Sequence, residues 1–104
     1  MKIPPSRCGP VLRAVRQHRG EVQDDVANRG NMNRAKVAQV ELGRNRATSA
    51  KVRTGLAAGF RDDRGVIDAL AEGRLDVADA AAAFGVPVAV VAGALADPTV
   101  EAAS

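Results

Sequence analysis

The chain has 104 residues, of which 46% are hydrophobic and 2% aromatic, and a single cysteine. This length fits one compact domain, and the lone Cys8 excludes an internal disulfide and a multi-cysteine metal site. No apolar run approaches the roughly 18 residues of a membrane span, and the first residues lack the apolar segment of a secretory signal. We therefore expect a cytoplasmic protein with no membrane partner.

The formal net charge of +3 is unevenly distributed along the chain. Residues 1–64 contain 14 Lys and Arg against 6 Asp and Glu, a local net charge of +8. Residues 65–104 contain only Arg74 against 6 acids, a local net charge of −5. This asymmetry favours a first half that binds a polyanion and a second half with another task, although a solvated surface alone also explains such charges.

Alanine and valine dominate the apolar residues, and long alternations of β-branched and polar residues are missing. This pattern predicts an all-α fold of short, closely packed helices. In chain order, we expect a flexible, proline-bounded lead over residues 1–10 and a first helix over 11–19 that ends at Gly20. A second helix is predicted over 22–29, with acidic residues in its first turn that complement the helix dipole.

A turn over residues 30–33 follows, because Gly and Asn tolerate left-handed backbone. Asn33 is predicted to cap a third helix over 34–42, which Gly43 closes. After a polar loop over 44–48, Thr48 or Ser49 caps a fourth helix that runs to about residue 60.

Three further elements complete the predicted chain. Asp62 or Asp63 starts a fifth helix that stops near Gly73, and Asp76 opens a sixth that runs to Phe84. Residues 88–96 are predicted to form a last helix, although their valine content alone would also fit a strand. We expect a compact bundle of about five short helices plus one or two C-terminal helices, divided into a lead (1–10), a main helical part (11–60), a C-terminal helical extension (61–97) and a tail (98–104).

The most informative stretch is residues 23–43. Two short helices that cross closely need a small residue at the crossing, which Ala27 supplies, and apolar anchors beneath, which Val26, Val37 and Val40 supply. A reversal within about four residues joins them. This spacing predicts a helix-turn-helix.

The second of these helices has an outward side, because Val37 and Val40 face inward. This side presents hydrogen-bond donors and small residues but no acid, as a helix in the DNA major groove requires. The residues on it are Arg34, Ala35, Lys36, Ala38 and Gln39.

Residues 13–60 resemble the Cro/C1-type (Xre) helix-turn-helix family of phage repressors and bacterial regulators. Gln23 stands where the family has a glutamine at the start of helix 2. Residues 41–43, Glu-Leu-Gly, resemble the family's Glu-x-Gly, and Arg16 stands where the family's arginine pairs with this glutamate. The resemblance therefore implies a structural clamp between Arg16 and Glu41.

The resemblance also implies which residues contact DNA. Arg34 would bond guanine, Gln39 would bond adenine, and Ala35 would touch a thymine methyl group. Other residues would contact mainly the DNA backbone: Gln23, Asn33, Lys36, Arg44 and Arg46. The chain departs from the family at Glu21, where an aliphatic residue is usual, at Val22, which replaces a capping residue, and at residues 30–31. These departures predict a less stable second helix.

Residues 79–95 also mimic a helix-turn-helix in the spacing of Ala, Gly and Val. The second helix of this segment carries no polar donor, so we expect a packing or dimer surface rather than a second DNA reader.

His18 is predicted to lie on the surface, without metal-ligand partners. Cys8 is expected in the lead without a catalytic role. No motif of a hydrolase, metalloprotease or phosphate-binding loop occurs, so we expect neither an enzyme nor a cofactor.

Two hypotheses of function follow. In the first, a homodimer binds double-stranded DNA at the nucleoid and represses transcription by occupying an operator whose half-sites lie about one helical turn apart. In the second, the chain is an antitoxin-like protein-interaction module that binds a protein partner through residues 86–95, and its DNA binding is autoregulatory. A sequence-blind architectural DNA binder is disfavoured, because exposed apolar wedges and a Lys-rich tail are missing.

Overall fold

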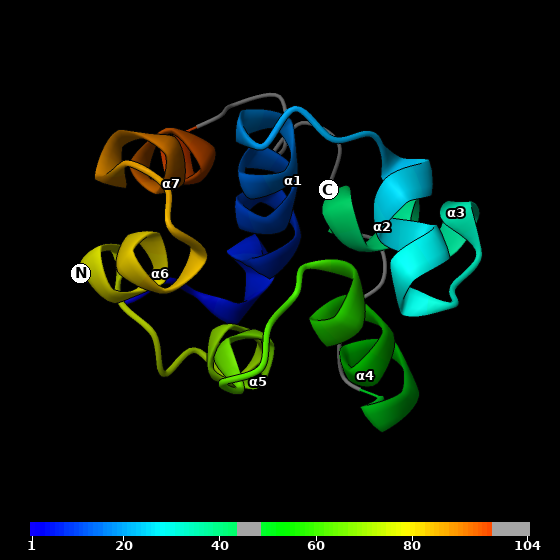
Figure 1. The fold of residues 1–104 in the computed structure, drawn as a ribbon. Helices are drawn as coiled ribbons and strands as arrows, with labels where there is room; N and C mark the ends of the chain where they lie inside the picture. Colours follow the sequence, from blue (N-terminus) through cyan, green and yellow to red (C-terminus); the bar gives the residue numbers. More distant parts are fainter. Residues whose placement is uncertain (44–48, 97–104) are drawn as a thin grey trace.

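The computed structural model describes residues 1–43 and 49–96, where it contains seven α-helices and one short 3-10 turn. Within these ranges no strand forms, and the only β-type pairing is an isolated bridge between Lys2 and Asp76. The predicted all-α bundle is confirmed (Figure 1). The elements are η1 (Pro5–Arg7), α1 (Cys8–His18), α2 (Gln23–Gly30), α3 (Arg34–Glu41), α4 (Ala50–Gly59), α5 (Val66–Ala71), α6 (Val77–Phe84) and α7 (Val88–Ala96).

Helix α1 forms the centre of the fold. Val11, Leu12 and Val15 on this helix are fully buried. α3 and α7 both pack against α1 from different sides, and α2 packs against α4 (Figure 1). α7, which belongs to the predicted extension over 61–97, thus shares its core with α1 of the predicted DNA-binding part over 11–60.

The first ten residues do not form the flexible lead that we expected. Ile3 is fully buried, and its backbone N–H donates to Leu75 O at 2.9 Å. Val77 N donates to Met1 O at 3.0 Å, and the Lys2 ammonium donates to Arg74 O at 2.8 Å. Helix α1 already begins at Cys8. The physical reason is that the apolar side chain of Ile3 gains more by entering the core than the segment loses in conformational freedom.

Short polar side chains start several helices, as predicted. The side-chain oxygens of Asn33, Ser49 and Asp76 accept hydrogen bonds from the first-turn N–H groups of α3, α4 and α6 at 2.8, 3.1 and 2.9 Å. Asp62 accepts three backbone N–H groups at the start of α5. Burial opposes the ionisation of Asp62, but these backbone hydrogen bonds outweigh it and lower the pKa of the carboxyl group.

The turn after α2 differs in register from the prediction. Helix α2 continues through Gly30, and Asn31 takes the left-handed conformation with φ 51° and ψ 46°. Gly30 lies against α4 so closely that a Cβ there would sit 2.2 Å from Gly55 O. Residue 30 must therefore be glycine because the backbones of α2 and α4 touch. Among the described residues, no helix is long and apolar enough to cross a membrane.

Candidate nucleic-acid interface

Two eight-residue helices joined by a three-residue turn, α2 and α3, form the unit that the sequence predicts to read DNA. Val26 and Ala27 of α2 are buried, as are Val37 and Val40 of α3. Met32 N donates to Ala27 O at 2.8 Å and closes the turn. These contacts fix one helix across the other, so the outward side of α3 is held in a defined orientation.

The outward side of α3 carries the three residues predicted to read bases. Arg34, Ala35 and Gln39 are all exposed, and Lys36 is half-buried beside them. One feature of this surface was missed from the sequence: Asp24 of α2 places a carboxylate oxygen 4.0 Å from Arg34 Nε. Both side chains are about two-thirds exposed, at 67% and 63%, so this ion pair is weak and leaves Arg34 available to a ligand.

A buried ion pair fastens α3 to α1. Arg16 donates from Nε and Nη2 to the two carboxylate oxygens of Glu41, at 2.7 and 3.0 Å. The side chains are 10% and 2% exposed. The remaining Arg16 Nη1 donates to Glu21 O at 2.8 Å, in the link that leads to α2. A two-pronged guanidinium–carboxylate pair of this kind fixes orientation as well as distance, so the clamp determines where α3 sits.

Gln23 belongs to the same network. Its side-chain Nε2 donates to Glu41 Oε1 at 3.2 Å, and the residue is half-buried. One amide N–H is thus used inside the protein, and the second remains for an outside acceptor. The structure therefore places Gln23 beside the clamp at the start of α2, where the resemblance puts a phosphate contact.

Glu21, where the resemblance leads to the expectation of an aliphatic residue, has an ion-pair partner in the structure. Arg29 of α2 pairs with both Glu21 oxygens at 2.7 Å. The same guanidinium donates to Gly59 O at 3.0 and 2.8 Å, at the end of α4. Through Arg29, the link before α2 is thus joined to α2 and to the end of α4. The start of α2 is secured in a similar way, since Val22 N donates to the Asp25 carboxylate at 2.9 Å.

A second unit, α6 and α7, repeats the geometry of α2 and α3 at a distance of 54 residues. Helix bounds 23–30 correspond to 77–84, and the helix start at 34 corresponds to 88. The left-handed Asn31 corresponds to Gly85, which has φ 70° and ψ 35°. The hydrogen bond from Met32 N to Ala27 O corresponds to Val86 N to Ala81 O at 3.0 Å. The helix-turn-helix mimicry seen in the sequence is therefore a true structural likeness.

The outward sides of the two units differ in chemistry. Where α3 presents Arg34, Ala35 and Gln39, α7 presents only apolar or side-chain-free positions. These exposed residues are Val88, Ala89, Ala92, Gly93 and Ala96. Lacking donors and acceptors, this side of α7 offers nothing that reads a base edge.

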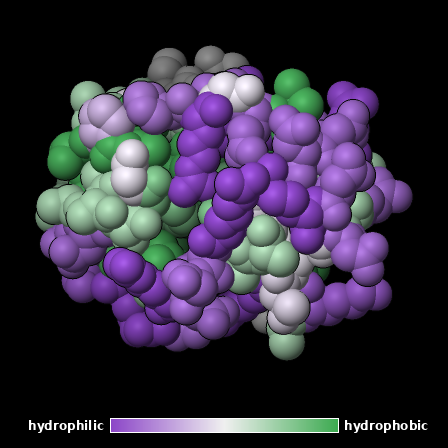
Figure 2. All heavy atoms as spheres, in the orientation of Figure 1, coloured by the Kyte–Doolittle hydropathy of each residue, from purple (hydrophilic) through white to green (hydrophobic). Residues whose placement is uncertain are grey.

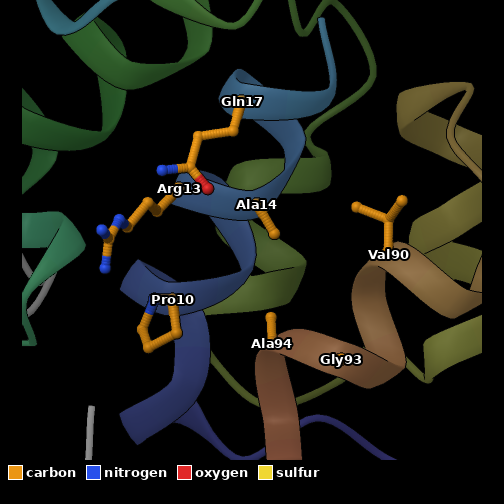
Figure 3. A pocket seen from close by; sticks show the side chains of 7 residues that line it. All are labelled: Pro10, Arg13, Ala14, Gln17, Val90, Gly93 and Ala94. Atoms are coloured by element: carbon orange, nitrogen blue, oxygen red, sulfur yellow. The ribbon is translucent and has the colours of Figure 1, made fainter. Parts of the chain in front are cut away.

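A shallow hollow of about 260 Å³ lies between α1 and α7. Figure 3 shows Ala14 of α1 and Val90 of α7 facing each other, whereas Arg13 and Gln17 project from α1 to the other side. The floor is apolar and one rim is polar. This arrangement fits a protein surface better than a small polar ligand.

The remaining residues singled out in the sequence are Cys8, His18, Arg44 and Arg46. Cys8 is buried in the core, and burial raises the pKa of its thiol to about 12, so it is no nucleophile at neutral pH. His18 is exposed at the end of α1. In the part of the chain that the structure describes, no group of three His, Cys, Asp or Glu side chains is placed to hold a metal. Arg44 and Arg46, predicted to contact the DNA backbone, lie outside the described residues.

No protein-family model, curated protein sequence or solved structure matches this chain.

Proposed function

We propose that the protein binds double-stranded DNA in a sequence-specific way and regulates transcription, as a repressor that occupies its operator. The observation that carries this proposal is the outward side of α3, where Arg34, Ala35 and Gln39 are exposed together on a helix whose position the buried Arg16–Glu41 pair fixes. A helix that reads bases needs both features, because its donors must reach base edges from a rigid support.

The charge of this region supports the proposal. Lys36 and Asn33 flank the reading residues, and the surplus of positive charge lies in the first 64 residues. Asn33 uses its side-chain oxygen to cap α3, so its amide nitrogen remains for a phosphate. Phosphate contacts of this kind position a protein on the duplex, whereas Arg34, Ala35 and Gln39 would specify the sequence.

Selection of bound duplexes from a random pool at about 150 mM salt tests the proposal, since nonspecific phosphate attraction is weakened there. The expected result is an enriched motif. Binding that vanishes at this salt without any enriched motif would refute sequence-specific recognition.

Replacing Arg34 by Ala is expected to erase the preference at one base position and to cost about 1–3 kcal/mol of binding free energy on the selected site. Lys36→Ala is the matched control, because loss of a phosphate contact weakens binding to all sequences alike and lowers the salt slope by about one. Titration of the selected duplex and its single-base variants measures both. Uniform weakening by Arg34→Ala would assign Arg34 to the DNA backbone instead.

We further propose that the DNA-binding protein is a homodimer that pairs through α7. The second candidate function is an interaction module that binds another protein through the same helix. The observation that favours either is the apolar outward side of α7, where Val88 is 52% exposed. Exposed apolar surface of this kind commonly marks an interaction site.

Val88→Glu is expected to convert a dimer into a monomer at micromolar concentration, as measured by sedimentation. Val22→Glu is the matched control, because Val22 is similarly exposed, at 59%, but lies at the start of α2. The interaction module would be favoured over the homodimer by two results together. The wild-type chain would sediment as a monomer, and it would co-purify with one partner in equal amount that the Val88→Glu variant no longer retains.

A further inference from the structure

A cluster of arginines lies away from α3, near the ends of α1 and α4. Arg19 follows α1, Arg29 lies in the last turn of α2, and Arg61 follows α4. Figure 2 shows strongly hydrophilic side chains crossing the middle of one face of the molecule, over α1 and the region between α1, α2 and α4 in Figure 1. This cluster took no part in the sequence-based hypotheses.

The acidic residues near the cluster bond to groups other than Arg19 and Arg61. Both oxygens of Glu21 are taken by Arg29. The Asp62 carboxylate accepts backbone N–H groups at the start of α5, and Asp63 lies beside Arg64 at 4.0 Å. In the described ranges, no carboxylate forms an ion pair with Arg19 or Arg61. Arg19 and Arg61 therefore have no directly bonded carboxylate there, although Glu21 acts on Arg19 through space.

Arg19 is held rigidly. Its Nη1 donates to Phe60 O at 2.9 Å and its Nη2 to Phe84 O at 3.0 Å, and its guanidinium carbon lies 5.9 Å from the centre of the Phe84 ring. A guanidinium has five N–H donors, so three remain. Burial lowers the pKa of Arg19; Glu21 raises it, while the charges of Arg29 and Arg61 lower it further. An anion at this place would relieve that repulsion.

Arg61 occupies a backbone position that disfavours arginine. Its φ is 58°, in the left-handed region, at the point where the chain leaves α4. Glycine is the usual residue there, because a side chain in this conformation costs free energy. A strained backbone that keeps a long cationic side chain indicates that the side chain has a use.

Arg19 and Arg61 line two adjoining hollows of about 320 and 370 Å³. The first is walled by Phe60 and Phe84, and Asp62, Asp63 and Arg64 also line it. Glu21 completes the second. None of the lining residues belongs to α2 or α3, so Arg19 and Arg61 line a space of ligand size that is distinct from the base-reading surface.

We propose that Arg19 and Arg61 bind a phosphate group carried by a small molecule. Guanidinium groups match the oxygens of a phosphate in planar, paired hydrogen bonds, and the aromatic wall beside Arg19 excludes water from one side. This site is independent of the DNA-binding proposal, because none of the residues that line it belongs to α2 or α3.

The test is thermal unfolding in about 20 mM sodium phosphate against sodium chloride of equal ionic strength. Wild type is expected to gain roughly 3–8 °C in phosphate. Arg61→Gly is expected to be more stable than wild type in chloride, because the backbone strain is relieved, and to lose most of the phosphate gain. Phosphate also stabilises proteins through exclusion from their surface, so the difference between variants is the quantity of interest.

Arg74→Ala is the matched control, since Arg74 is an exposed arginine that lines none of these hollows and should keep the full phosphate gain. Arg61→Lys, which keeps the charge, is expected to keep part of it. Equal phosphate gains in wild type and Arg61→Gly would overturn the site. A salt slope of duplex binding that falls by about one in Arg61→Gly, but not in Arg74→Ala, would overturn the small-molecule source and assign the phosphate to DNA.

Discussion

Replacing Glu41 by Gln is expected to lower the free energy of unfolding by about 3–5 kcal/mol. The substitution keeps the size of the side chain but leaves the buried Arg16 side chain, 10% exposed, without its negative partner. It also weakens the hydrogen bond from Gln23 Nε2 to Glu41 Oε1. Urea denaturation followed by circular dichroism measures the loss as a lower midpoint at an unchanged slope.

Glu72→Gln is the matched control for this substitution. Glu72 also receives hydrogen bonds from two arginines, Arg53 and Arg74, each at 3.0 Å, but it lies in solvent. We expect little change in stability there, because exposed ion pairs contribute little. Equal losses at positions 41 and 72 would show that burial does not govern the strength of the clamp.

A double substitution separates stability from positioning. Arg16→Met with Glu41→Leu removes both charges and fills a similar volume, so most of the lost stability should return. Sequence-specific binding should not return fully, because Gln23 loses its anchor and the two-pronged geometry that orients α3 is gone. Full recovery of both properties would limit the clamp to a packing role.

Local signals allowed much of the fold to be predicted from the sequence. A short polar side chain that caps a helix acts on N–H groups two or three residues away, so Asn33 and Asp76 were recognisable without tertiary information. The left-handed turn after α2 was recognisable for a similar reason, because Gly and Asn favour this conformation and Asn31 adopts it. The resemblance supplied the pairing of Arg16 with Glu41, which spacing alone does not specify.

Features that depend on distant contacts were not predictable. Ile3 is buried in a segment whose backbone bonds to Leu75, and no nearby pattern indicates that partner. The pairing of Glu21 with Arg29, and of Arg29 with Gly59 O, likewise joins segments that only the fold brings together. Asp24 sits beside Arg34 for the same reason, although the outward side of α3 itself carries no acid.

Glycines at helix crossings show most clearly that contacts between distant segments cannot be predicted from local sequence. Gly9→Ala in α1 is expected to cost roughly 3 kcal/mol, because a Cβ there would sit 1.8 Å from Val40 O, which is backbone of α3. The carbonyl cannot rotate away as a side chain can, so α1 and α3 must separate. The strain falls on the helix that Glu41 clamps.

Gly93→Ala is the matched control, since Gly93 also lies within a helix but has nothing within 4 Å of its virtual Cβ. There the substitution should stabilise by about 0.5–1 kcal/mol, because alanine favours the helix over the unfolded chain. Denaturant unfolding of the two variants should therefore show changes of opposite sign in the free energy of unfolding, although both replace Gly by Ala. Loss of stability at both positions would mean that α7 is covered by another surface in solution, whereas no loss at Gly9 would mean that α1 and α3 do not owe their spacing to this contact.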